Sequence, residues 1–225
     1  MPGDFSYRGG ASANPQFDQS TLLLEDCEGT YKWLNSGTGA DYVGLFDASF
    51  CYFGTKGWKL RTRATTPAAD DIVTAGRPLT FPMVRRLIVR GRVNFSDVSL
   101  VKALYCQLAV YDGVRGYPAT LRFRPNTPDV CYLNSAGVYV AIPALAVVVG
   151  DLNWYMFEMA IDLVSLKYVY ARFGGIEADL SGLAIQDAGA FAARSVQLTF
   201  DMTAIGAAQA EVGMDSVYVG AHDQL

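Results

Sequence analysis

Residues 87–95, LIVRGRVNF, indicate the fold of this chain most clearly. The large apolar side chains occupy alternate positions, at Leu87, Val89, Val93 and Phe95. The polar side chains occupy positions between them, at Arg90, Arg92 and Asn94. Because successive side chains of a β-strand point to opposite faces of a sheet, this period of two predicts a strand with one buried face.

The same alternation continues on both sides of this segment, from Thr21 onward. Residues 57–64 place Trp58 and Leu60 on one face and Lys59 and Arg61 on the other. Further strands are predicted at 101–111, 119–124, 130–133, 138–142, 154–163, 166–173, 196–200 and 212–219. Two short stretches, 185–193 and 204–211, could each form a helical turn but are too short to be stable alone. The pattern predicts an all-β protein, a two-sheet antiparallel jelly-roll β-sandwich.

The chain of 225 residues fits one such domain preceded by an arm. Residues 1–20 are rich in Gly, Ser, Asn and Pro and carry the aromatic residues Phe5, Tyr7 and Phe17. We expect residues 1–20 to form an extended N-terminal arm and residues 21–225 to form the jelly-roll domain.

The composition favours contacts with other macromolecules. The chain is 51% hydrophobic and only 18% charged, so apolar side chains exceed what the core needs. Arginine outnumbers lysine, as in protein interfaces, although a genomic bias toward arginine would have the same effect. A net charge of −4 argues against general binding of nucleic acid. These features predict protein partners, in a homo-oligomer or a larger assembly.

Neither a secretion signal nor a membrane span is evident. Residues 1–20 lack an apolar core, and the apolar run 138–149 is short and interrupted by Pro143. We therefore expect synthesis in the cytoplasm without a signal peptide, no membrane partner, and a final location that includes the virion as one candidate.

Four stretches resemble the jelly rolls of concanavalin A-like proteins and carbohydrate-binding modules. Residues 22–29 (LLLEDCEG) are similar to a first strand that ends in an acidic pair before glycine, and residues 53–60 (FGTKGWKL) to a turn followed by a strand. Residues 154–175 resemble the late hairpin of laminin-G-type sandwiches, and residues 214–219 (MDSVYV) their closing strand. The resemblance is at superfamily level and implies the fold rather than a ligand.

No catalytic pattern is recognisable. Glycoside hydrolases use two carboxylates about 5–10 Å apart. Glu158 and Asp162 share a face of one predicted strand, but four residues of strand separate them by about 13 Å. The only histidine, His222, lies in the polar tail, where a base is hard to position. We therefore predict a protein that is not an enzyme.

Calcium is the one cofactor that we consider. Asp26, Glu28, Asp47 and Asp215 could supply oxygen ligands if the first and last strands pair. The alternative is that these are separate turn residues and that no cofactor binds.

Two surface features suggest binding. Arginine pairs at i and i+2 would form a cationic stripe for an acidic partner or an anionic glycan if their strands were neighbours: Arg61 and Arg63, Arg90 and Arg92, Arg122 and Arg124. Aromatic residues near predicted strand ends could stack on sugars, although most are expected in the core: Tyr31, Trp33, Tyr42, Tyr52, Trp58, Tyr117, Tyr132 and Trp154.

Two functions remain open. The first is a non-catalytic structural or assembly protein, such as a phage-like capsid-decoration or tail-associated jelly roll, which binds protein through its arm and arginines. This rests on analogy between folds. The alternative is a carbohydrate-binding module or lectin-like domain that binds a glycan.

Overall fold

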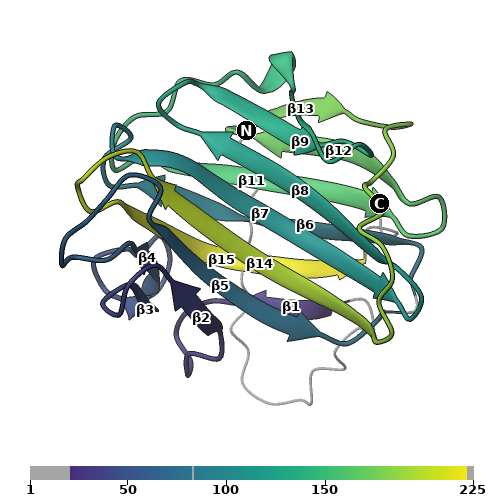
Figure 1. Ribbon diagram of the computed structural model, residues 1–225, viewed down its shortest axis with the longest axis horizontal. Helices are drawn as coiled ribbons and strands as arrows, with labels where there is room; N and C mark the ends of the chain where they lie inside the picture. The colour runs from purple at the N-terminus through teal and green to yellow at the C-terminus, as the bar shows by residue number, and fades with distance from the viewer. Residues whose placement is uncertain (1–20, 83, 222–225) are drawn as a thin grey trace.

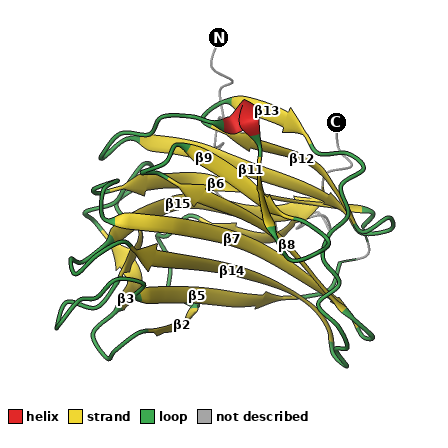
Figure 2. Ribbon diagram, turned by 45° about the horizontal axis from the view of Figure 1, so that its top comes forward, coloured by secondary structure: helices red, strands yellow, loops and turns green. Residues whose placement is uncertain are grey.

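The computed structural model describes residues 21–82 and 84–221 and confirms the all-β prediction. Two antiparallel sheets lie face to face in a jelly-roll β-sandwich. The strand axes of one sheet are broadly aligned with those of the other (Figure 1). One helical turn, η1 (Pro143–Leu145), lies beside the edge of one sheet (Figure 2). The described residues contain no helix that is long and apolar enough to cross a membrane.

The first sheet has eight strands, and we call it sheet A. Seven follow in the spatial order β13 (Ile176–Asp179), β12 (Lys167–Phe173), β11 (Trp154–Asp162), β6 (Arg86–Phe95), β15 (Glu211–Ala221), β4 (Gly57–Arg61) and β3 (Val43–Asp47). The eighth, β1 (Thr21–Glu25), pairs with β15 beside this path.

The second sheet, sheet B, has seven strands. Their order is β10 (Tyr139–Ala141), β9 (Asp129–Leu133), β8 (Gly116–Arg124), β7 (Val101–Asp112), β14 (Arg194–Ala204), β5 (Ile72–Leu79) and β2 (Leu34–Gly37). Strands β7 and β14 form its centre and pair over their whole length.

The core between the sheets follows the predicted alternation. The side chains predicted to point inward from 87–95 are buried, as are those of Trp58 and Leu60. Aromatic rings from the two sheets interleave: Phe200 of sheet B meets Trp58 and Phe157 of sheet A at ring-centroid distances of 5.4 and 5.9 Å. Such edge-to-face packing adds to the free energy gained from apolar burial.

The structure adds elements that the alternation did not predict and removes two that it suggested. Strands β2, β3, β5 and β13 are short or contain Gly and Pro, and their sequences carry little periodicity. Residues 185–193 and 204–211 form no helix. They are loops, except that Ala190 forms an isolated bridge with Arg115, Ala204 ends β14 and Glu211 begins β15. Short Ala- and Gly-rich segments lack the length that a stable helix needs.

Candidate functional site: a groove on the outer face of sheet A

A groove of about 530 Å³ crosses the outer face of sheet A, which is a size typical of small-molecule sites. It passes over β1, β15, β6 and β11 and is bounded by the loops that follow β1 and precede β4. Its lining combines apolar, aromatic and charged side chains with two glycines: Leu24, Asp26, Glu28, Phe53, Gly54, Arg90, Gly91, Arg92, Met156, Asp215, Ser216 and Tyr218.

The groove lies where β15 changes neighbours. Residues 211–214 of β15 pair with β4, whereas residues 217–220 pair with β1 on the same side. At the junction the pairing with β6 shifts register between Asp215 and Tyr218, and Ser216 has a φ of 54°. A bulge of this kind redirects side chains and interrupts the ladder. The space between β1 and β4 is therefore left to loops.

Asp215 anchors the loop that fills this space. Its carboxylate accepts hydrogen bonds from the backbone N–H groups of Tyr52 and Phe53, at 2.8 and 3.0 Å, and from the Ser216 hydroxyl at 3.1 Å. The Asp215 side chain is buried. The loop carrying Tyr52 and Phe53 is thus fastened to the bulge of β15.

Glu28 fastens the other side of the same loop. It accepts from the backbone N–H and the hydroxyl of Thr55, both at 2.6 Å, and from the Lys56 N–H at 3.0 Å. These hydrogen bonds hold the pKa of Glu28 below its usual value. Gly54 has a φ of 81°, which favours glycine, and a Cβ there would lie 2.2 Å from a Glu28 oxygen and displace that carboxylate.

The floor of the groove is built from β6 and its neighbours. Arg92 lies over the Tyr52 and Phe53 rings, with its guanidinium carbon 4.2 and 5.1 Å from their centroids. Arg90 lies 4.7 Å from the Tyr218 ring in the same way. Such cation–π contacts orient a guanidinium group without neutralising its charge.

Opposed residues of six strands form one row across this face. Pairing runs from Leu24 to Tyr218, to Arg90, to Glu158, to Arg172 and to Glu177. Side chains directly opposite one another interact across neighbouring strands. The row joins the groove to a charged cluster on β11 and β12.

That cluster is centred on Glu158, which is buried although it lies on the outer face. Glu158 accepts a hydrogen bond of 2.5 Å from the Tyr170 hydroxyl and lies 3.7 Å from Arg172. Burial and the neighbouring Glu158 carboxylate raise the pKa of Tyr170. The cluster holds its charges in fixed positions.

Asp162 lies on the same face of β11 as Glu158 but has different hydrogen-bond partners. Burial would raise its pKa, but hydrogen bonds from the N–H groups of Ser165 and Val164 and from Arg85 lower it to about 2. Glu158 and Asp162 therefore lie on one face, as expected, and each has its own partners. The absence of catalysis stays a prediction.

The predicted calcium ligands do not form one cluster. Asp26, Glu28 and Asp215 line the groove, but Asp47 lies at the end of β3 beside Lys59, 4.0 Å away. Within 21–82 and 84–221 no group of three or more acidic, Cys or His side chains is placed to hold a metal ion. The oxygens of Glu28 and Asp215 bind backbone N–H groups instead.

The prediction of one arginine stripe is wrong. Arg90 and Arg92 lie on β6 and Arg61 on β4 of sheet A, with β15 between them, but Arg122 and Arg124 lie on β8 of sheet B. Periodicity shows which way a side chain points within its strand, but not to which sheet the strand belongs. Within the described residues, two of the six arginines are in ion pairs, Arg63 with Asp71 at 2.8 Å and Arg124 with Asp129.

The other predicted binding residues have mixed outcomes. Phe5, Tyr7 and Phe17 lie outside the described residues, as does His222. Of the predicted aromatic residues, Trp33 and Trp58 are in the core, and Tyr52 lies beside the groove with 43% of its surface exposed.

Sequence reasoning missed Phe53 and Tyr218 as groove residues. The alternation of 212–219 could have placed Tyr218 outward, but no local pattern brings the loop that carries Phe53 to the same face.

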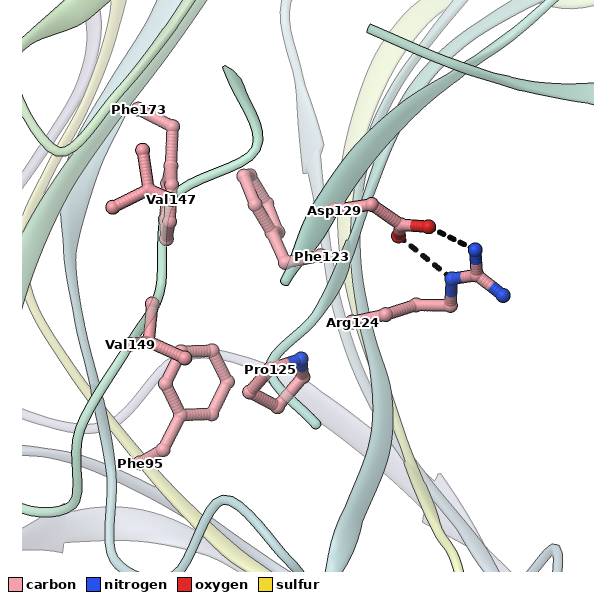
Figure 3. Close-up of a pocket in the computed structure, with 8 residues that line it drawn as sticks. All are labelled: Phe95, Phe123, Arg124, Pro125, Asp129, Val147, Val149 and Phe173. Carbon is pink, nitrogen blue, oxygen red and sulfur yellow. Dashed lines mark hydrogen bonds and ion pairs between the residues drawn. The ribbon is translucent and has the colours of Figure 1, made fainter. Parts of the chain in front are cut away.

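A second cavity has no room for a ligand larger than water. It lies between the sheets and has a volume of about 10 Å³, enough for about one water molecule. Figure 3 shows its aromatic and aliphatic lining and the ion pair of Arg124 with Asp129 beside it. The groove on sheet A is therefore the candidate site.

Comparison with known proteins supports the fold. No protein-family model matches the chain, and no curated protein matches its sequence. An endo-β-1,4-glucuronan lyase from the fungus Trichoderma reesei has 12% identity and a TM-score of 0.60, over 90% of this chain and 96% of that one.

Two further solved structures are similar in fold. The cellulose-induced protein Cip1 has 10% identity and a TM-score of 0.55, over 88% of this chain and 97% of that one. A conserved carbohydrate esterase of the Shiga toxin-encoding bacteriophage phi24B has 17% identity and a TM-score of 0.52, over 83% and 89%. These similarities confirm the predicted β-sandwich fold.

Proposed function

We propose that this protein binds carbohydrate in the groove on the outer face of sheet A. The observation that carries the proposal is the exposed Phe53, with 55% of its surface accessible, beside Tyr52 and the guanidinium group of Arg92. Sugars present an apolar C–H face and a rim of hydroxyl groups, so a site needs an apolar platform next to charged hydrogen-bonding groups. The groove provides both.

The opposite wall supports the same function. Leu24 is 59% exposed at the edge of the groove, and Met156 lies on β11 across its floor. Leaving such side chains in water costs free energy unless a ligand covers them. The three carbohydrate-active or cellulose-induced proteins of similar fold make carbohydrate a reasonable ligand class, by analogy between folds.

A matched pair of substitutions tests this proposal. We expect Phe53→Ala to weaken saccharide binding roughly fivefold, because the lost stacking is worth about 1 kcal/mol. Phe191→Ala is the control: Phe191 is also partly exposed and stacks on Tyr111 at 3.9 Å, but it lies in a loop beside sheet B. Binding is first screened on an array of neutral and acidic glycans and then measured by isothermal titration calorimetry.

The two variants decide between outcomes. Unchanged binding in Phe53→Ala, or an equal loss in Phe191→Ala, would remove the groove as the site. Failure of the wild-type chain to bind any glycan would refute carbohydrate binding itself.

We keep assembly, on a capsid or tail or in a homo-oligomer, as a second proposal. Large apolar side chains are exposed on edge strands, with Leu34 on β2 and Ile176 on β13, where another protein can pack. Light scattering after size-exclusion chromatography tests self-assembly, and a monomer at all concentrations would count against a homo-oligomer.

A further inference from the structure

We propose that the groove takes a carboxylated saccharide, and that Arg92 binds its carboxylate. This inference rests on the proposed function and adds the chemical class of the ligand. It follows from the state of the charged side chains in the groove.

Arg92 is oriented but not neutralised. Its guanidinium group stacks on the Tyr52 and Phe53 rings, yet it makes no ion pair or hydrogen bond with any residue that the structure describes. The planar guanidinium group presents several N–H donors in a fork that matches a carboxylate in two parallel hydrogen bonds. A side chain held in place by rings loses little further entropy when it binds.

The acids nearest to Arg92 are engaged elsewhere. Asp215 is directly opposite Arg92 in the pairing of β15 with β6, but its carboxylate binds two backbone N–H groups and Ser216. Glu28 is occupied by Thr55 and Lys56. Asp26 accepts from the Glu28 N–H at 3.2 Å. These contacts hold the loops, and none of them compensates the charge of Arg92.

The neighbouring strand positions add positive charge beside Arg92. Arg90 lies two residues away on the same face of β6, so the two side chains leave the strand about 7 Å apart. Glu158, opposite Arg90, is shared with Tyr170 and Arg172. A carboxylate at Arg92 would also be attracted by the charge of Arg90, whereas a neutral sugar would not.

The groove also suits the rest of an acidic sugar. Phe53, whose ring contacts Arg92, offers its exposed surface to the C–H face of the ring that carries the carboxylate. Asp26, at the loop end of the groove, can accept hydrogen bonds from hydroxyl groups of the next unit. The groove therefore carries positive charge over β6 and hydrogen-bond acceptors at the loops. A carboxylated saccharide matches this arrangement with its carboxylate and its hydroxyl groups.

The test compares each acidic saccharide with its own methyl ester, which keeps the linkage and removes the charge. The panel holds oligomers of glucuronate, galacturonate, mannuronate and guluronate and a sialylated oligosaccharide, titrated into the full chain by calorimetry. We expect at least one free acid to bind ten times or more tightly than its ester, and Arg92→Gln to bring this ratio close to one.

Arg194→Gln is the matched control. Arg194 also lies over an aromatic ring, with its guanidinium carbon 4.1 Å from the Phe81 centroid, and the described residues give it no ion pair. It begins β14 in sheet B, so this variant should keep the wild-type ratio.

The outcomes separate this inference from the proposed function. Saccharide binding with no preference for free acids, or a preference that survives Arg92→Gln, would overturn the inference and leave carbohydrate binding standing. If neither acids, esters nor neutral glycans bind, the proposed function itself has failed.

Discussion

The two central strands β14 and β15 lie in opposite sheets and show how a groove arises in this fold. In sheet B, β14 keeps β7 and β5 as neighbours along most of its length, from Val196 to Thr203. In sheet A, β15 has β6 on one side, but on the other it leaves β4 after Met214 and meets β1 at Val217. Where a strand keeps the same neighbours, the sheet is continuous. Where it changes neighbour, a gap opens between the two neighbouring strands, and loops line that gap.

An outward aspartate on each strand reflects this difference. Asp215 of β15 is buried and binds the loop backbone at the gap. Asp201 of β14 is half-buried and accepts a hydrogen bond of 2.5 Å from the Thr74 hydroxyl. Burial raises the pKa of Asp201, and the Thr74 bond only partly opposes this. The Asp215 carboxylate thus stabilises the loop beside it, while the Asp201 carboxylate is poorly solvated.

The largest effect should come from Asp215→Ala. It removes the acceptor of two partly buried backbone N–H groups, so we expect a loss of about 3 kcal/mol in the free energy of unfolding. Saccharide binding should fall with it, because the loop carrying Phe53 is released. Urea unfolding gives the first quantity and calorimetry the second. Full stability with intact binding would show that the loop is held by other contacts.

A glycine on each sheet tests the packing beneath the loop. At Gly57 an added Cβ would lie 1.7 Å from the backbone oxygen of Phe50, so Gly57→Ala must displace the loop and should cost about 2 kcal/mol. At Gly76 in sheet B the nearest atom is the Gln197 amide nitrogen at 3.3 Å, a side chain that can move. Gly76→Ala should stay within about 0.5 kcal/mol of the wild type in the same unfolding experiment. Equal losses of stability in Gly57→Ala and Gly76→Ala would show that the loop does not pack more tightly on Gly57 of sheet A than the Gln197 side chain packs on Gly76 of sheet B.

The smallest effect, and the opposite sign, is expected for Asp201→Asn. Because burial raises the pKa of Asp201 in the folded state, the ionised carboxylate destabilises the fold at neutral pH. The stability linked to this group is fully present below the unfolded pKa and is lost as pH rises through the folded pKa. Asn carries no charge, so the variant should be more stable at pH 7 by about 1 kcal/mol or less, and should gain nothing near pH 3. Unfolding curves at the two pH values measure this, and a loss of stability at pH 7 would refute it.

The fold was predictable where a strand has one clearly buried face. Leu87 and Phe95 belong to a run whose alternation cannot suit a helix, and both are buried. The strand β5 was not recognised, since Gly76 and Pro78 interrupt its pattern. This segment forms a strand because it pairs with β14 and β2, and the sequence of the segment itself does not reveal that pairing.

The groove was predictable only in pieces. Alternation predicts that Arg90 and Arg92 point outward from one strand, but it also predicts a common stripe with Arg122 and Arg124, which lie on β8 in sheet B. Phe53 belonged to a stretch that resembled a turn before a strand, and its exposure beside Arg92 depends on the anchoring of its loop by Asp215. That contact joins residues far apart in the chain.

Alternation along the chain is enough to predict the secondary structure class, the inward side of the long strands and the outward position of Arg92. These follow from alternation, which is a local property of the chain. Packing of the whole sandwich sets which strands are neighbours, and it brings β1, the Tyr52–Phe53 loop and β6 to one groove. Strand order depends on contacts summed over the whole sandwich, and no local pattern encodes them.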